Sequence, residues 1–267
     1  PATIDETDKG FNPKFALTWK PRRDFSIYGS AVRGFRFGGI NAVTPPEAAA
    51  LNVPITFKSD TLWNYELGTR TDWFNGRMTA DLTVFYIDWK KPQILQLKAG
   101  AIGYTDNVGA ARSQGVESQV SALLPWNLFA SISGAYIDAR TTEEFNSDNG
   151  AVPPGTLMPA TPYVSGAGVL THRLNLAGWQ LLSSYTITYH GWSHNTLQNT
   201  TPLPAYVLHG LSLNVVKTDW SLRPELNFSV NNLADKHVPL FAEKTPGSPV
   251  IIANQPRTIA LTLSLSY

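Results

Sequence analysis

Hydrophobic and polar residues alternate with a period of two through Thr61–Gln93, which indicates extended strand. One face carries Trp63, Tyr65, Leu67, Thr69, Thr71 and Trp73, and the other carries Asn64, Glu66, Gly68, Arg70 and Asp72. Phe74-Asn75-Gly76 predicts a tight turn, because Asn-Gly supplies the positive φ that a short hairpin needs. The chain returns through Arg77–Trp89, whose apolar face holds Met78, Ala80, Leu82, Val84 and Tyr86. Each arm has about 11–13 residues, close to the 9–11 of a tilted strand that crosses a bilayer. The pattern predicts a membrane-spanning β-hairpin.

The same pattern recurs along the chain and predicts eleven strands. They are Phe11–Lys20, Asp24–Gly34, Leu62–Trp73, Arg77–Trp89, Gly109–Leu124, Leu128–Asp138, Pro162–His172, Trp179–Trp192, Ala205–Val216, Trp220–Asn232 and Arg257–Tyr267. The fold class we predict is all-β, an antiparallel up-and-down transmembrane barrel. Pro224 cannot donate to a strand ladder, so we expect a bulge or a rim there.

The connections between these strands alternate strictly between short and long. Pro21-Arg22-Arg23, Asn75-Gly76 and Lys217-Thr218-Asp219 are short, whereas Phe35–Asp60 and Leu233–Asn254 are long, and we expect Phe35–Asp60 to be irregular. Outer-membrane barrels have short periplasmic turns and long extracellular loops, whereas nothing in a soluble sandwich requires short and long connections to alternate. We therefore expect the long segments, among them Thr141–Thr161, outside the cell.

The eight tryptophans test this interpretation independently. Trp19, Trp73, Trp126, Trp179 and Trp220 lie at the short-turn ends of the predicted strands, and Trp63, Trp89 and Trp192 lie at the long-loop ends. Two aromatic belts at the membrane interfaces predict this placement, because an indole favours a site with one apolar and one wet edge. A soluble core would place several tryptophans centrally.

Composition narrows the function classes. The chain has 267 residues, no cysteine and a formal net charge of +1, with no basic run. We therefore expect no nucleic-acid partner, no disulfide framework and no thiolate metal site. No apolar run reaches about 18 residues, so a transmembrane helix is not expected. The chain begins at Pro1 without a signal-peptide pattern, and we expect it to be a piece of a longer protein.

Several short motifs together resemble the barrel domain of TonB-dependent outer-membrane receptors. They are Asn64-Tyr65-Glu66-Leu67-Gly68, Phe85-Tyr86-Ile87-Asp88-Trp89 with Gln93, Asn107-Val108-Gly109-Ala110-Ala111, Gly115-Val116-Glu117, Asn231-Asn232-Leu233 and the terminal strand that ends at Tyr267. Their order covers essentially the whole chain. The resemblance implies the outer membrane of a Gram-negative bacterium and contact with its lipid.

Eleven is an odd number, whereas bacterial single-chain barrels have even strand counts. The resemblance implies that residues 1–267 form the C-terminal half of a plugged barrel of about 22 strands. It also implies a plug domain, further strands and an N-terminal TonB box that contacts the energising complex, all absent from this sequence. We expect the eleven strands to form an open sheet, because closure would crowd charged residues into a narrow lumen.

The polar face carries charged residues that would be costly against lipid. Those we place inside the lumen are Glu66, Arg70, Asp72, Asp81, Glu117, Gln119, Arg223 and Glu225. In a plugged receptor we expect them chiefly to hold the plug by hydrogen bonds and ion pairs, with direct contact to ligand as the alternative.

The sequence contains no catalytic motif, and we predict neither an enzyme nor a cofactor or metal site. For ligand contact we consider loop-proximal residues of types that suit an anionic or aromatic chelate. These are Arg33, Arg36, Tyr104, Arg140, His190, Trp192 and His194. His190 and His194 can equally be interfacial polar residues.

Three functions remain open from the sequence. The first is energised uptake of a scarce small-molecule ligand, with a ferric siderophore as the leading choice; corrinoids, saccharides and aromatic compounds are the other cargoes that the resemblance allows. The second is a passive porin, which would need about 16–18 strands around an open lumen. The third is a soluble β binding module, against which the aromatic belts and the loop rhythm argue.

Overall fold

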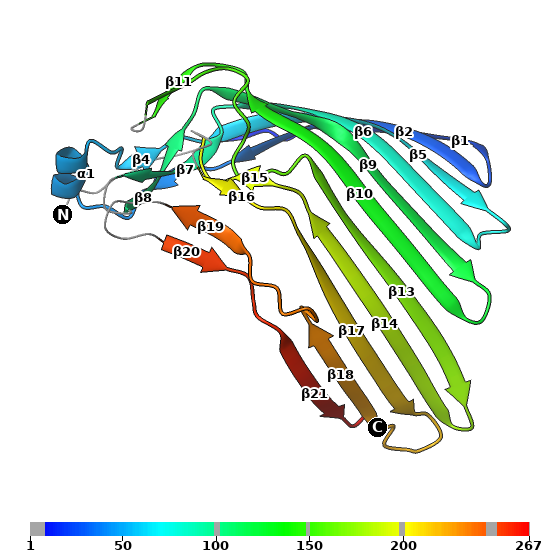
Figure 1. Ribbon diagram of the computed structural model, residues 1–267. Helices are drawn as coiled ribbons and strands as arrows, with labels where there is room; N and C mark the ends of the chain where they lie inside the picture. Colours follow the sequence, from blue (N-terminus) through cyan, green and yellow to red (C-terminus); the bar gives the residue numbers. More distant parts are fainter. Residues whose placement is uncertain (1–8, 99–101, 148–149, 198–200, 244–249, 267) are drawn as a thin grey trace.

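The computed structural model describes residues 9–98, 102–147, 150–197, 201–243 and 250–266, and its main element is one antiparallel sheet of eleven strands. In sheet order these are β1 (Lys14–Arg22), β2 (Phe25–Arg36), β5 (Asp60–Trp73), β6 (Met78–Lys90), β9 (Ala110–Leu124), β10 (Leu128–Thr141), β13 (Val164–Leu176), β14 (Trp179–His190), β17 (Tyr206–Lys217), β18 (Glu225–Asn231) and β21 (Thr258–Ser264). Each strand pairs with its neighbours along the chain (Figure 1). The predicted fold class and the eleven predicted strands are confirmed.

The sheet is curved and open (Figure 1). Within the described residues, β1 pairs only with β2 and β21 pairs only with β18, so the first and last strands do not meet. The prediction of an open sheet is therefore confirmed. Two unpaired edges leave rows of backbone N–H and C=O groups that membrane lipid cannot satisfy.

Most strand ends agree with the sequence pattern, and the departures have local causes. The turn after β5 is built on Phe74, Asn75 and Gly76, all with positive φ, as the Asn-Gly pair predicts. The strand predicted from Trp220 begins only at Glu225, because Pro224 has no N–H for the ladder. Strand β13 continues to Leu176 instead of the predicted His172, and β14 begins at Trp179 as predicted, so the turn between them is only Ala177-Gly178.

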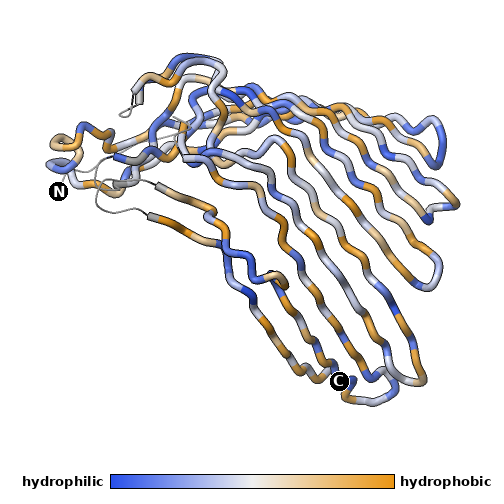
Figure 2. The backbone as a smooth tube through the Cα atoms, viewed as in Figure 1, coloured by the Kyte–Doolittle hydropathy of each residue, from blue (hydrophilic) through white to orange (hydrophobic). Residues whose placement is uncertain are grey.

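The strand register divides the sheet into two faces of different polarity. Residues that pair directly in an antiparallel ladder share a face, so Arg70, Asp81 and Gln119 lie on one face and Leu82 with Thr69 on the other. The alternation is visible along every long strand (Figure 2). On the apolar face Leu67, Leu82 and Leu263 are about half to two-thirds exposed, which is expected of a surface that lipid covers. We call this the outer face.

The long connections carry more structure than the sequence indicates. Each contains a short two-stranded ribbon: β3 (Gly39–Ile40) with β4 (Thr56–Phe57), β7 (Gln93–Lys98) with β8 (Ile102–Asn107), β11 (Phe145–Ser147) with β12 (Gly150–Val152), β15 (Ser193–His194) with β16 (Pro202–Leu203), and β19 (Pro239–Glu243) with β20 (Val250–Ala253). These ribbons gather at one end of the sheet (Figure 1). The prediction that Phe35–Asp60 is irregular is wrong, because β3, β4 and a helix lie within it.

The first long connection also contains a helix, α1 (Pro45–Leu51). Thr44 caps it: its backbone N–H donates to Glu47 Oε2 (2.9 Å), and its hydroxyl accepts from Glu47 N (3.4 Å). Hydrogen bonds from Thr44 hold the pKa of Glu47 below its usual value. Asn52 ends the helix in the left-handed conformation. The sequence Thr44-Pro45-Pro46-Glu47 is a capping box with proline in the first turn, so the signal was present.

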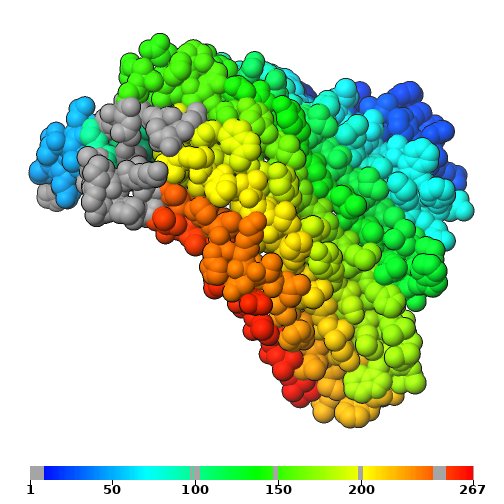
Figure 3. All heavy atoms as spheres, viewed as in Figure 1, coloured from blue at the N-terminus to red at the C-terminus, as the bar shows by residue number. Residues whose placement is uncertain are grey.

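The buried core lies mainly among the long connections and at the strand ends next to them. One cluster centres on Val108, Val152 and Met158, and a second on Ala48, Val53 and Tyr104. Figure 3 shows these segments packed together at the end of the sheet opposite the short turns. No helix among the described residues is long and apolar enough to cross a membrane.

Candidate functional site

The polar face of the sheet gathers most of the predicted lumen residues. Glu66, Arg70, Asp72, Asp81, Glu117, Gln119 and Glu225 share this face by register. A hollow of about 500 Å³ lies over it between β6 and β14, which identifies it as the concave face. Asp81, Glu117 and Gln119 line that hollow. We call Glu66, Arg70, Asp72, Asp81, Glu117 and Gln119 of β5, β6 and β9 the charged wall.

Most side chains of the charged wall have a polar partner on the same face. Arg70 Nε lies 3.8 Å from Asp81 Oδ1, Asp72 accepts from the Thr79 hydroxyl at 2.9 Å, and Glu66 accepts from Asn64 at 2.6 Å. Glu117 is the exception: no hydrogen bond or ion pair to its carboxylate is found within the described part of the chain. An exposed carboxylate that faces the hollow is available to a further partner.

Arg223 does not belong to this wall. It lies in the turn before β18 with a φ of 34°, and its backbone N–H donates to Trp220 O at 3.2 Å. Its predicted place on a strand is therefore wrong, because that strand begins at Glu225. Glu225 does face inward and accepts from Asn214 Nδ2.

Two glycines on the strands of the charged wall, Gly68 of β5 and Gly115 of β9, lie where a side chain would collide with neighbouring atoms, concave-face aromatic rings among them. A Cβ at Gly68 would lie 2.4 Å from the ring of Tyr28, and one at Gly115 would lie 2.9 Å from Phe85. Glycine thus lets a ring on the neighbouring strand lie flat over the sheet. The Tyr28 hydroxyl then reaches Thr83 Oγ1 at 2.6 Å. This explains why Gly68 and Gly115 stand in otherwise regular strands.

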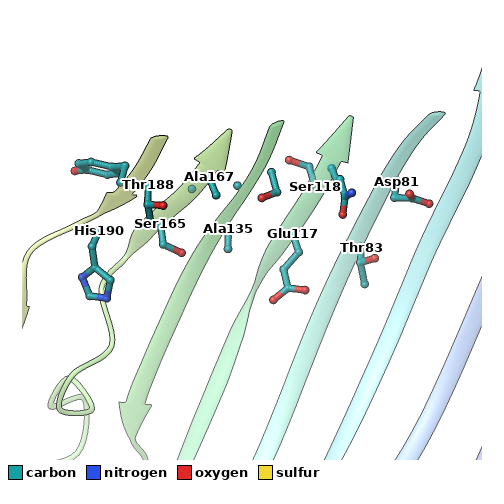
Figure 4. A pocket seen from close by; sticks show the side chains of 14 residues that line it. Asp81, Thr83, Glu117, Ser118, Ala135, Ser165, Ala167, Thr188 and His190 are labelled. Atoms are coloured by element: carbon teal, nitrogen blue, oxygen red, sulfur yellow. The ribbon is translucent and has the colours of Figure 1, made fainter. Parts of the chain in front are cut away.

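The hollow has unlike sides (Figure 4). Figure 4 shows Glu117 and Asp81 on one side, His190 on the other, and the short side chains of Ala135, Ser165 and Ala167 between them. The ring of His190 stacks on Tyr206 at 5.2 Å. Among the described residues no three His, Cys, Asp or Glu side chains cluster as metal ligands would. The hollow offers carboxylate, hydroxyl and imidazole groups for binding a polar molecule.

A second polar network closes the bases of two long connections. Asp60, nearly buried at the start of β5, accepts from Arg36 Nε (3.0 Å), Trp89 Nε1 (3.1 Å) and Gln93 N (3.0 Å). The Arg36 guanidinium also lies over the Trp89 ring, 5.0 Å from its centroid. Asn107 continues the network by donating to the carbonyls of Lys58 and Lys91, both at 2.9 Å. We call this network the loop clamp.

The loop clamp supports two connections that pack as one unit. Asn41 in the first donates to Thr105 O at 2.9 Å in the second and accepts from Thr105 N at 2.7 Å. Tyr104, 5% exposed, packs against Ala48 and Val53 of the first connection. The sequence analysis missed the clamp, although Trp89, Gln93 and Asn107 belong to the motifs that carry the resemblance.

The last long connection is closed in a similar way by asparagines. Asn232 Nδ2 donates to Lys236 O at 2.9 Å, and Asn254 Nδ2 donates to the same carbonyl at 2.9 Å. Asp235 accepts from Arg257 N at 2.9 Å, and this backbone hydrogen bond lowers the pKa of the carboxyl. The Asn231-Asn232-Leu233 motif thus marks the base of a loop.

The structure does not bring the seven ligand-contact candidates together. His190 alone of the seven lines the hollow. Arg36 is held by Asp60, and Tyr104 is buried in the paired loops. His194 lies in β15 with its Nδ1 buried and, within the described residues, without a hydrogen-bond partner.

The other three candidates belong to the outer side. Arg33 pairs with Trp63 on the outer face and donates to Phe11 O at 3.2 Å. Arg140 is one residue out of phase with the concave positions of β10; it donates to Asp138 (2.6 Å) and lies over the Tyr163 ring (5.9 Å). Trp192 makes an edge contact with Tyr163 at 6.0 Å. Side chains alternate between the two faces along β10, so counting from Ser133 on the concave face would have placed Arg140 on the outer face.

The tryptophans follow the two-belt prediction with one correction. Trp19, Trp73 and Trp179 lie on the outer face near the short turns, and Trp126 and Trp220 lie in those turns. Trp63 and Trp192 lie at the long-loop end, where Trp192 is about half exposed. Trp89 has concave-face parity and donates to Asp60, so its assignment to a lipid belt is wrong.

Comparison with known proteins gives a consistent result. The sequence model of the family described as TonB dependent receptor-like, beta-barrel matches residues 2–233. The metal-pseudopaline receptor CntO of Pseudomonas aeruginosa is 24% identical over an alignment that takes in 98% of this chain and 34% of the receptor. The chain therefore spans about a third of the length of the curated relatives it matches.

Solved structures share the fold. The ferric yersiniabactin uptake receptor FyuA from Yersinia pestis superposes with a TM-score of 0.71 at 20% identity, over 93% of this chain and 36% of that chain. BauA, the ferric preacinetobactin receptor from Acinetobacter baumannii, superposes with a TM-score of 0.70 at 19% identity, over 95% and 36%. At these identities the likeness concerns the fold.

Proposed function

This chain belongs to the TonB-dependent receptor family as part of its β-barrel domain, and from that premise we propose that it forms one side of a receptor for energised uptake of a small metal chelate. The family is one of outer-membrane receptors and not of enzymes, and the location is the outer membrane of a Gram-negative cell. Family membership also argues against the passive porin considered from the sequence.

The observation that carries the proposal is the difference between the two faces of one open sheet. The outer face exposes apolar side chains such as Leu67 and Leu82, while the concave face carries the charged wall and the hollow. Within the part of the chain that the structure describes, both edges of the sheet are unpaired, which fits a larger barrel that further strands complete. In that barrel the charged wall holds a plug domain, and a TonB-type complex energises its movement.

For the ligand we propose a metal chelate, with a ferric siderophore as the first choice. The supporting observations are the names of similar proteins: CntO is a metal-pseudopaline receptor, FyuA a ferric yersiniabactin uptake receptor and BauA a ferric preacinetobactin receptor. For ligand contact we propose His190, which lines the hollow on the concave face.

Uptake measurements on cells that carry the full-length receptor test this proposal. Four strains are compared, with and without the receptor gene and with and without the energising protein. Each is given radioactive iron, zinc or nickel complexed with chelators that the bacterium itself secretes. We expect gene-dependent uptake of iron that disappears without the energising protein. Gene-dependent uptake of zinc or nickel without uptake of iron would show that the ligand is a chelate of one of those metals and not a ferric siderophore. Equal uptake with and without the energising protein would refute energised transport.

A further inference from the structure

We propose that the outer face of this wall binds the phosphate groups of membrane lipid at the long-loop end of the sheet. The site consists of four cations on neighbouring strands, Arg33 of β2, Lys90 of β6, Arg112 of β9 and Arg140 of β10, and we call them the basic rim. The inference concerns the membrane side of the barrel, so it does not depend on which cargo the receptor carries.

The register aligns the three arginines of the basic rim in one row across five strands. Arg33 pairs with Trp63, and Trp63 pairs with Asp88. Asp88 pairs with Arg112, and Arg112 pairs with Arg140. Because partners in an antiparallel ladder share a face, all five side chains lie on the outer face. The long-loop ends of these strands lie side by side in the sheet (Figure 1).

The depth of this row in the membrane follows from the residues next to it on the same strands. On β6 the outer face runs from Val84 through Tyr86 to Asp88, in steps of about 7 Å. Tyr86 pairs with Tyr65, and both are somewhat less than half exposed. Tyrosines on a lipid-facing surface lie at the level of the headgroups. The next step outward, which holds Arg112 beside Asp88, therefore reaches the phosphates at the membrane surface.

The protein does not balance the charge of the basic rim. Lys90 lies two residues beyond Asp88 on the same face, and its Nζ is 3.2 Å from Asp88 Oδ1. Arg140 Nε donates to Asp138 Oδ1 at 2.6 Å. Four cations thus face two carboxylates, a net charge of +2, and both carboxylates already have a partner. Within the described part of the chain, the Arg112 guanidinium has neither a hydrogen bond nor an ion pair.

The direct pairing of Arg112 with Arg140 is a second observation that points to an anion. Like charges that lie opposite each other on one face of a sheet destabilise it. The Arg140 guanidinium is held in place by Asp138 and by Gly155 O, to which it donates at 2.9 Å. A phosphate bound to Arg112 would remove the repulsion, because a guanidinium binds phosphate through two parallel hydrogen bonds.

The outer-face cations at the opposite end of the sheet are balanced by carboxylates. Arg22 Nε lies 3.4 Å from Asp24 Oδ1, and Lys217 Nζ lies 3.0 Å from Asp219 Oδ1. The Lys217 ammonium also lies over the ring of Trp179, 4.9 Å from its centroid. Among the described residues of the outer face, the unbalanced positive charge therefore belongs to the end that carries the long connections.

The surroundings of the basic rim favour a lipid over a dissolved anion. Trp63, which pairs with Arg33, stacks on Tyr65 with ring centroids 6.0 Å apart. Leu67, further along the same face, is more than half exposed. Cations next to such an apolar surface suit a molecule with a charged head and an apolar body. At the extracellular end of an outer-membrane barrel this molecule is the phosphorylated glycolipid of the outer leaflet.

Binding of lipid A, the phosphorylated anchor of that glycolipid, to the purified full-length receptor tests the inference. Receptor in a non-ionic detergent is titrated with lipid A or with chemically dephosphorylated lipid A, and native mass spectrometry counts the bound lipid. Inorganic phosphate is added as a competitor. Arg112→Gln removes the unpaired cation, Asp88→Asn removes the carboxylate opposite it, and Arg22→Gln is the matched control at the short-turn end of the same face. Only receptor with the heat-modifiable mobility of a folded barrel is used.

We expect Arg112→Gln to bind lipid A several-fold more weakly than the unchanged receptor, Asp88→Asn to bind it more tightly, and Arg22→Gln to bind it equally well. Misfolding cannot produce a gain in affinity, so Asp88→Asn decides the test if Arg112→Gln assembles poorly. Unchanged affinity in both variants of the row would overturn the inference, as would equal binding of dephosphorylated lipid A. Displacement of lipid A by inorganic phosphate would show a site for a free anion and overturn the assignment to lipid.

Discussion

A charge placed on the outer face of β6 should prevent assembly, whereas the same charge one residue away on the concave face should be tolerated. Leu82 is the middle of five apolar outer-face residues on this strand, Met78 to Tyr86, and Asp88 follows them on the same face. It is about half exposed, so a substituted side chain would meet lipid. An arginine at the middle of a bilayer costs about 2–4 kcal/mol, and each 1.4 kcal/mol is tenfold in the folded fraction.

The matched control is Thr83→Arg. This change removes the Thr83–Tyr28 hydrogen bond, worth about 1 kcal/mol. It places the new guanidinium directly opposite Glu117, an interaction of about 0.2–1 kcal/mol. The two terms nearly cancel, so we expect assembly close to that of the unchanged receptor.

The assay is the amount of heat-modifiable receptor in outer-membrane fractions, followed by urea unfolding of purified receptor in detergent micelles. We expect Leu82→Arg to lose most of the folded band and Thr83→Arg to keep it, while Leu82→Phe controls for the change in size. Equal damage by Leu82→Arg and Thr83→Arg would refute the assignment of the two faces.

Three further predictions follow from single contacts. Asp60→Ala should leave the donors of the loop clamp unpaired at a cost of about 1–3 kcal/mol, so limited proteolysis of the two paired loops should accelerate; unchanged cleavage would mean that the clamp does not hold them. Gly115→Ala should lower the urea midpoint, because its Cβ would meet a backbone carbonyl at 2.1 Å, whereas Gly29→Ala, whose nearest atom is 3.7 Å away, should not; equal midpoints would contradict the close packing. The hydrogen bond from the Arg257 amide lowers the pKa of Asp235 from 3.8. The stability that this bond gives to the last long loop is therefore present above that pH and lost as the pH falls below it. Protease sensitivity of the last long loop should rise at low pH, and Asp235→Asn should remove this pH dependence. If the rise persists in the variant, another titrating group causes it.

The strands of this protein could be read from its sequence because their signal is local. Period-two alternation fixes both the strand and its outer face, as at Leu82 and Asp81, and Asn75-Gly76 specifies its own turn. The charged wall was predicted for the same reason, since parity along one strand decides the face. Arg223 was misplaced because Pro224 shortens the strand from which its parity was counted.

The loops and the site depended on contacts between distant segments, which no local pattern reports. Asn41 bonds Thr105 across 64 positions, and Tyr104 is buried by a helix from another connection. The alternation along β6 already places Trp89 on the concave face, but only the fold shows that its indole donates to Asp60, 29 positions away.

What the sequence by itself determined is therefore the sheet, its two faces and its short turns, because each follows from the period of two and from the conformations of a few residues. The tertiary structure alone decided which rows of side chains lie together across the sheet. The charged wall becomes one surface only because Arg70 is paired with Asp81 and Asp81 with Gln119. Register is a relation between strands, and it is set by pairing that a single strand cannot encode.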